Sequence, residues 1–312
     1  MQNPHIPHRI SDFSTSNILA IWLRDFLLDV RAANRSEATI EYYQEKLTPF
    51  LAFLQDEKVC EPEQITARHL RVFLVHLGES RGSGGVHAYW RAVRAFVRFL
   101  VREDAIERNP LDKMRSPKLD QELLDPIPME DIQALLSTCE KSTIDLRDKA
   151  LILTLLDTGL RAGEMLALNI GDVNLSDASI AIHKTKSRKG RFVFMGRKAR
   201  RAITAYLRKR ESTSSDQPLW LTCALGGEQN RLSYDGLRDM VKRRADKAQI
   251  EAPTLHGFRR SFAISMLRSG ADIISLSRMM GHGSLPILTR YLKQLKEDLS
   301  DVHAQHAPTD RL

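Results

Sequence analysis

Two histidines, an arginine and a tyrosine lie within 36 residues near the end of the chain. The stretch begins with His256 and Arg259, passes through His282 and ends at Tyr291. A hydroxyl can attack phosphorus when its proton is removed, cations bind the non-bridging oxygens and an acid protonates the leaving oxygen. Because phenoxide leaves more readily than an alkoxide, a tyrosine also suits a covalent intermediate that must later be reversed. The stretch therefore indicates reversible phosphoryl transfer.

Two basic segments upstream could supply the remaining parts of such a site. Arg161 follows Gly159, which ends an apolar run, and Glu164 comes three residues later on the same helical face. A carboxylate at this spacing can orient the guanidinium for bidentate phosphate binding, although an ordinary surface ion pair has the same pattern. Lys186 begins a basic turn between expected strands, where a lysine could protonate a leaving 5′ oxygen or simply contact a nucleic-acid backbone.

The composition favours a polyanionic partner. Lysine and arginine number 47 against 39 aspartate and glutamate, which gives the 312 residues a formal net charge of +8. The three cysteines are widely spaced and support neither a disulfide framework nor a zinc knuckle. No carboxylate cluster with metal spacing and no nucleotide-binding glycine loop occurs, so we expect no metal and no cofactor. Apolar runs of signal-peptide or membrane-spanning length are also missing, which predicts a cytoplasmic protein.

Periodicity predicts a helical first half. The length favours two domains, and helical spacing of apolar residues predicts helices over 17–33, 37–55 and 86–102. A further helix is expected to begin after Thr66 as its N-cap. Asn109-Pro110 should end this bundle.

The second half is predicted to be mainly helical, with a small antiparallel sheet formed by two strands within 179–195. The expected fold class is therefore mainly α with a small antiparallel β-sheet. The expected organisation is a helical domain over 14–110, a linker over 111–127, a second domain over 128–297 and a tail over 298–312.

The helix over 86–102 carries a basic stripe. At 100° per residue, four arginines fall on one side, and the apolar residues Val93, Phe96, Val97 and Leu100 fall on the other. The four are Arg91, Arg94, Arg98 and Arg102. Because no acid is interleaved to relieve their repulsion, we favour DNA contact over a merely solvated face. Weaker candidates for DNA contact are Arg188, Lys189, Arg243 and Arg244.

Six residues taken in order resemble the catalytic set of the tyrosine recombinase, or phage integrase, family, including the Xer-type recombinases. They are Arg161, Lys186, His256, Arg259, His282 and Tyr291. Thr158-Gly-Leu-Arg161-x-x-Glu164 looks like the first arginine box of the family, and Lys186 stands five residues before Arg191, as the hairpin lysine does. His256-x-x-Arg259 resembles the second box, and the tyrosine follows Gly281-His282 at the family spacing.

The resemblance implies a clamp around DNA, made by an N-terminal four-helix core-binding domain and a C-terminal catalytic domain. Tyr291 would attack the scissile phosphate, form a 3′-phosphotyrosyl bond and release a 5′-hydroxyl that Lys186 protonates. Arg161, Arg259 and His282 would hold the phosphate, and His256 would assist proton transfer. Since the phosphotyrosyl bond conserves the energy of the phosphodiester, ATP would not be needed. Cationic side chains would supply the charge stabilisation that metal ions provide in other phosphoryl-transfer sites, so no metal would be needed either.

The resemblance also implies the partners. These would be double-stranded DNA with paired recombination half-sites, and further copies of the chain or a related recombinase, as a dimer on each site and a tetramer in the synaptic complex. Strand exchange would pass through a Holliday junction, for integration, excision or dimer resolution. The tail over 298–312 would dock on a neighbouring protomer. No membrane is implied, and the expected location is bacterial and nucleoid-associated.

Two other functions fit parts of the pattern. A type IB topoisomerase shares the tyrosyl chemistry, but the N-terminal helical domain and the tail argue against it. A DNA-binding accessory protein of the same fold would not cleave, and the intact set of six residues argues against that.

Overall fold

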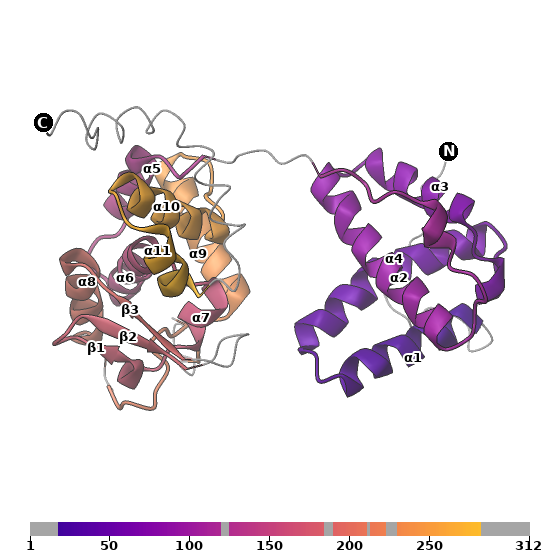
Figure 1. The fold of residues 1–312 in the computed structure, drawn as a ribbon. Helices are drawn as coiled ribbons and strands as arrows, with labels where there is room; N and C mark the ends of the chain where they lie inside the picture. Colours follow the sequence, from indigo (N-terminus) through magenta and orange to yellow (C-terminus); the bar gives the residue numbers. More distant parts are fainter. Residues whose placement is uncertain (1–17, 120–124, 184–189, 211–212, 223–229, 282–312) are drawn as a thin grey trace, which may run out of the picture. The chain divides into compact units, whose positions relative to one another are not determined.

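The computed structural model describes residues 18–119, 125–183, 190–210, 213–222 and 230–281. The chain divides into two compact units, the first ending at Glu122 and the second beginning at Leu123 (Figure 1). Each unit has its own hydrophobic core. Predictions for Lys186, Arg188, Lys189, His282, Tyr291 and the tail fall outside the described residues.

The first unit is built from four long helices. They are α1 (Ile18–Ala32), α2 (Glu37–Asp56), α3 (Ala67–Gly78) and α4 (Ser83–Arg102), with short 3₁₀ turns η2 (Pro62–Gln64) and η3 (Pro110–Lys113). Thr66 caps α3 as predicted, since its hydroxyl accepts from the His69 N–H at 3.4 Å. The expected start of the linker belongs to this unit, because Leu111 is buried in its core.

The long helix α4 lies at the centre of the first core. The four apolar residues predicted to face inward, Val93, Phe96, Val97 and Leu100, are all at most 2% exposed. Phe96 packs against the aromatic ring of Phe26 from α1, with the two ring centroids 5.7 Å apart. The helix begins at Ser83, ahead of the predicted position 86, so Gly84 and Gly85 lie in its first turn. Its buried side fixes which way the opposite, arginine-bearing side faces.

The second unit combines helices with one small sheet. Its helices are α5 (Met129–Ser137), α6 (Thr143–Thr158), α7 (Ala162–Ala167), α8 (Arg197–Leu207), α9 (Tyr234–Ala248), α10 (Leu255–Arg268) and α11 (Ile273–Met280), with the 3₁₀ turn η4 (Ile170–Asp172). The strands β1 (Val173–Asn174), β2 (Ser179–Ile182) and β3 (Arg191–Phe194) pair antiparallel in that order. The predicted fold class is confirmed. Strand β1 was not predicted, because two residues are too few to show an alternating pattern.

The end of α6 determines where Arg161 stands. Helix α6 packs against α8 and α10 and ends at Gly159, which has a left-handed φ of 58°. A Cβ at this position would collide with the ring of Phe262 in α10, so the tight approach of the two helices requires glycine. The reversal carries the chain through buried Leu160 to Arg161 at the start of α7.

A buried charge network joins α5, α6 and α9, and it corrects one prediction. Arg244 is 4% exposed, and its guanidinium donates to Asp148 and Asp145 at 2.7 Å and to the Thr138 carbonyl at 2.7 Å. Burial opposes ionisation of Asp145, but hydrogen bonds from Ser142 and Arg244 lower its pKa to about 2. Arg244 is therefore an internal structural group, and this geometry argues against its predicted DNA contact.

Arg243, its neighbour in α9, stands differently. Its side chain is 57% exposed, and it donates to the same Asp148 at 2.8 Å. DNA contact by Arg243 stays a prediction.

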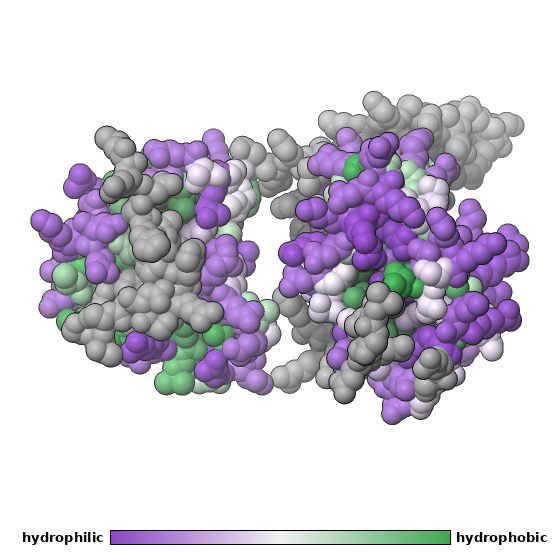
Figure 2. All heavy atoms as spheres, turned by 180° about the vertical axis from the view of Figure 1, so that it is seen from behind, coloured by the Kyte–Doolittle hydropathy of each residue, from purple (hydrophilic) through white to green (hydrophobic). Residues whose placement is uncertain are grey.

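Hydrophilic side chains predominate among the coloured residues on the face of each unit that is shown in Figure 2, with small hydrophobic areas between them. Among the exposed large hydrophobic residues are Phe192 and Phe194 of β3, at 63% and 62%. Within the described ranges, the helices are too short or too polar to cross a membrane.

Candidate active site

Arg161 is held at the start of α7 by Glu164. The Arg161 backbone N–H donates to Glu164 Oε2 and its Nη1 donates to Glu164 Oε1, both at 3.0 Å. This double attachment fixes both the helix start and the guanidinium. The side chain of Arg161 is 44% exposed and that of Glu164 only 8%, so the guanidinium keeps an open edge. The predicted pairing of these two residues is confirmed.

Glu164 has a second and tighter partner that was not predicted. Arg191, the first residue of β3, donates from Nη2 to Oε2 at 2.7 Å and from Nη1 to Oε1 at 3.0 Å. Burial raises the pKa of Glu164, but the hydrogen bond from Arg191, the Arg161 N–H and the two positive charges lower it overall. Glu164 is therefore ionised at neutral pH, and one carboxylate is shared between two guanidinium groups.

Arg259 is the most buried cation of this region, at 3% exposed. It lies on α10 and donates from Nη1 to the Gly159 carbonyl at 2.5 Å and from Nη2 to the Met280 carbonyl at 2.6 Å. Both carbonyls belong to the ends of helices, α6 and α11, where the partial negative charge of a helix favours a cation. Arg259 thus ties together two helix ends that are far apart in sequence.

Three arginines converge on the end of α11. Arg191 Nε donates to the Met279 carbonyl at 2.9 Å, and Arg161 Nη2 donates to the Gly281 carbonyl at 3.2 Å. With the bond from Arg259 to Met280, three successive carbonyls each accept from a different arginine. Gly281 ends the helix with a left-handed φ of 61°. This is the residue that immediately precedes His282 in the sequence.

His256 lies in the first turn of α10, one turn before Arg259. Thr254 caps this helix through a 3.0 Å bond from the Gly257 N–H. Partial removal from water, followed by the positive charges of Arg259, Arg260 and Arg161, lowers the pKa of His256. A pKa below the ordinary histidine value means that the ring is neutral at neutral pH, so it can accept a proton.

The described part of the site is therefore a cluster of cations, two of which share the carboxylate of Glu164. Arg161, Arg191 and Arg259 bring three positive charges and Glu164 one negative charge, an excess of two. Such a preorganised excess suits the non-bridging oxygens of a phosphate. No group of three or more histidine, cysteine or acidic side chains that could hold a metal occurs among the residues that the structure describes.

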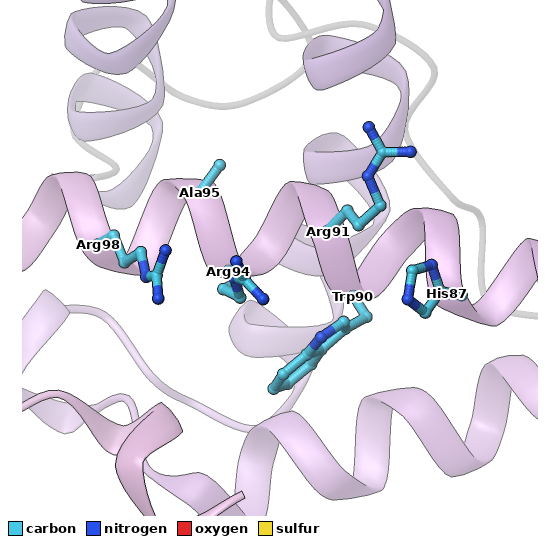
Figure 3. Close-up of a pocket in the computed structure, with 6 residues that line it drawn as sticks. All are labelled: His87, Trp90, Arg91, Arg94, Ala95 and Arg98. Carbon is cyan, nitrogen blue, oxygen red and sulfur yellow. The ribbon is translucent and has the colours of Figure 1, made fainter. Parts of the chain in front are cut away.

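A second candidate surface lies on α4 of the first unit. Arg91, Arg94 and Arg98 line a pocket of about 340 Å³ together with His87, Trp90 and Ala95. Figure 3 shows Arg94 and Arg98 projecting on the same side of α4, while the guanidinium of Arg91 extends away from them. All three are exposed, and over the described ranges no ion pair involves them.

Arg102, the fourth member of the predicted stripe, is engaged within the protein. It pairs with Asp29 at 2.8 Å and with Glu103 at 3.1 Å, and it lies over the ring of Phe99. The positive charge of Arg102 is therefore largely balanced by these two carboxylates, whereas the charges of Arg91, Arg94 and Arg98 are not balanced in this way.

Two family models match the chain. The one described as "Phage integrase family" matches residues 127–298, more than half of the chain. The one described as "Phage integrase, N-terminal SAM-like domain" matches residues 23–104. The chain therefore belongs to the phage integrase family of tyrosine recombinases, as its motifs predicted.

Individual relatives agree with this. Tyrosine recombinase XerC of Pelobacter propionicus is 31% identical over 281 residues, which cover 89% of this chain and 92% of the relative. The crystal structure of XerA recombinase is 25% identical, with a TM-score of 0.50, and the match covers 93% of this chain and 99% of that one. XerH, solved in a pre-cleavage complex with its difH substrate, has the same fold, with a TM-score of 0.62 at 20% identity and coverage of 93% and 91%.

Proposed function

We propose that this chain cleaves and rejoins DNA at specific sites, with Tyr291 as the nucleophile. The observation that supports the proposal most strongly is the convergence of Arg161 and Arg259 on the end of α11, directly before His282 in the sequence. Two of the predicted phosphate ligands, 98 residues apart in sequence, are thereby held at one place. Family membership supports the reaction type, DNA strand transfer through a tyrosine.

In the proposed reaction, the Tyr291 hydroxyl attacks the scissile phosphate while its proton passes to neutral His256. The bond from the tyrosyl oxygen to phosphorus forms as the bond from phosphorus to the 5′ oxygen breaks, and Lys186 protonates the leaving oxygen. Arg161, Arg259 and His282 bind the non-bridging oxygens. Since the cluster leaves two positive charges in excess, it can stabilise the charge that builds up in the transition state. The 5′-hydroxyl of a second strand then reverses the step.

The proposed partners follow from the same reaction. The substrate is double-stranded DNA with paired half-sites, bound by two copies per site and four in the synaptic complex, or by copies of a related recombinase. The relative XerH has been solved bound to its difH substrate. The proposed location is the bacterial cytoplasm, on the nucleoid, where the substrate is. Integration, excision and dimer resolution all use this chemistry.

The three arginines of α4 that form no ion pair within the described residues, Arg91, Arg94 and Arg98, are proposed to contact DNA phosphates. We expect the Arg94→Ala, Arg98→Ala double variant to bind DNA more weakly and to lower the slope of log Kd against log salt by about two, roughly one for each arginine removed from a phosphate. The matched control is Arg102→Ala on the same helix, whose charge Asp29 and Glu103 already balance. Fluorescence anisotropy over a range of salt concentrations measures the slope. An unchanged slope in the double variant, or an equal reduction in the control, would remove Arg94 and Arg98 from the interface.

Plasmid assays separate recombination from its rivals. The binding site is first obtained by selecting bound fragments from random DNA, and it is then placed once, twice or not at all in supercoiled plasmids. We expect recombinant products only from plasmids with two sites. Relaxation of plasmids without a site would indicate a topoisomerase. Tight binding without any cleaved or recombined DNA would indicate a DNA-binding accessory protein.

A further inference from the structure

We propose that Arg191 is a positioning residue for DNA cleavage, which holds Glu164 and thereby keeps Arg161 directed at the phosphate. The proposal rests on the proposed function. Arg191 lies outside the predicted catalytic set. It donates hydrogen bonds to Glu164 of α7 and to the Met279 carbonyl of α11.

Strand β3 directs Arg191 inward. Side chains alternate along a strand, and Val193 of β3 is 2% exposed whereas Phe192 and Phe194 are more than 60% exposed. Arg191 therefore shares the inner side with Val193, and its side chain is only 11% exposed. A long cation is buried in this position only where acceptors are provided, and here Glu164 and the Met279 carbonyl provide them.

The fit around the guanidinium is tight. A Cβ built on Gly281 would lie 2.8 Å from Arg191 Cζ, so the guanidinium lies against the bare backbone of that glycine. The same glycine carbonyl accepts from Arg161. Arg191 thus sets the position of the end of α11 against the start of α7. Arg161 and Arg259, two of the predicted phosphate ligands, are held at this place.

The charge arrangement explains why this matters for Arg161. Both oxygens of Glu164 accept from Arg191, and Arg161 uses only one side-chain nitrogen on Glu164 while the other reaches Gly281. Without Arg191, the buried carboxylate would keep only Arg161 as a cationic partner. A lone carboxylate favours a bidentate guanidinium. We therefore expect Arg161 to turn toward Glu164 and to lose both its bond to Gly281 and its orientation for phosphate.

A matched arginine distinguishes this role from ordinary structural support. Arg231 lies in the same unit and donates to the Leu166 and Leu168 carbonyls at 2.8 and 2.9 Å and to Asn169 Oδ1. It supports the end of α7 as Arg191 supports its beginning, but none of these three bonds involves Glu164. Lysine substitutions at both positions keep the charge and remove the forked geometry.

The test compares Arg191→Lys, Arg231→Lys and the wild-type chain on a nicked DNA substrate that traps the cleaved state. For Arg191→Lys we expect a single-turnover cleavage rate lower by about 100-fold, as for a displaced catalytic group, with Kd for DNA within about threefold of the wild-type value. Arg231→Lys should cleave at nearly the wild-type rate, although its Tm should change by about as much as that of Arg191→Lys. Equal cleavage rates in the two variants would overturn the proposal. No cleavage by the wild-type chain would instead refute the proposed function.

Two further readouts identify the route through Glu164 and Arg161. In a double-mutant cycle, Glu164→Gln and Arg191→Lys should not be additive, because both act on the same guanidinium. On a methylphosphonate substrate, which lacks one negative oxygen at the scissile position, the defect of Arg191→Lys should shrink, because less charge needs the clamp. Additive effects in the cycle would overturn this route. So would a defect that shrinks only on a 5′-phosphorothiolate substrate, in which a thiolate leaves without needing a general acid.

Discussion

Arg259→Ala is expected to reduce the rate of DNA cleavage by about 10³-fold or more while leaving the affinity for the DNA site within several-fold. The variant removes a buried positive charge from the phosphate site and leaves the Gly159 and Met280 carbonyls without their guanidinium donor. Affinity should persist because most of it arises from dispersed phosphate contacts on both units. Single-turnover cleavage on a trapping substrate and a binding titration measure the two quantities on the same preparation.

A loss of stability could imitate this result, so the prediction needs two controls. Arg244→Lys changes an equally buried arginine in a charge network that uses Asp145 and Asp148. It should lower Tm but leave the cleavage rate of the folded protein nearly unchanged. Arg161→Ala, at a side chain that is 44% exposed, should lose cleavage with little change in Tm. Near-normal cleavage by Arg259→Ala or by Arg161→Ala would contradict the phosphate-clamp role of that residue.

The fold followed closely from local patterns. The apolar spacing predicted α1 to α4, and the hydroxyl of Thr66 predicted the start of α3, because caps and helix faces depend on residues only a few positions apart. The features that were missed depend on distant partners. The sequence made the basic pair Arg243-Arg244 a weak candidate for DNA contact, but Arg244 is buried against carboxylates from α6, almost 100 residues away.

The site was predictable in its parts but not in its connections. The spacing of Arg161 and Glu164 predicted their pairing, because both lie on one turn. Arg191, 27 residues away on a strand, donates hydrogen bonds to both carboxylate oxygens of Glu164. In sequence, Arg191 is one of several cations at a basic turn. Only the alternation that places Val193 in the core marks Arg191 as inward-facing, and a four-residue strand makes that signal faint.

The second large effect concerns the nucleophile. Tyr291→Phe removes one oxygen atom and should abolish the covalent protein–DNA adduct and every later step, because none of the cationic groups can replace a nucleophile. Site-specific DNA binding should stay within several-fold of the wild-type value, since the phenol contributes at most one of many contacts. The chain has six tyrosines, and Tyr234 is an exposed one on the second unit. Tyr234→Phe is therefore a matched control that should cleave normally.

The most direct measurement is a gel assay for the covalent adduct on a labelled DNA site that carries a nick beside the cleavage position. The short fragment released by cleavage diffuses away, so the tyrosyl bond cannot be reversed and the adduct accumulates. We expect the wild-type chain and Tyr234→Phe to form a protease-sensitive adduct at the 3′-phosphate end of the cut strand, with peptide mapping to Tyr291, and Tyr291→Phe to form none. An adduct formed by Tyr291→Phe, or its absence from the wild-type chain on a DNA site that it binds, would contradict the assignment of Tyr291 as the nucleophile.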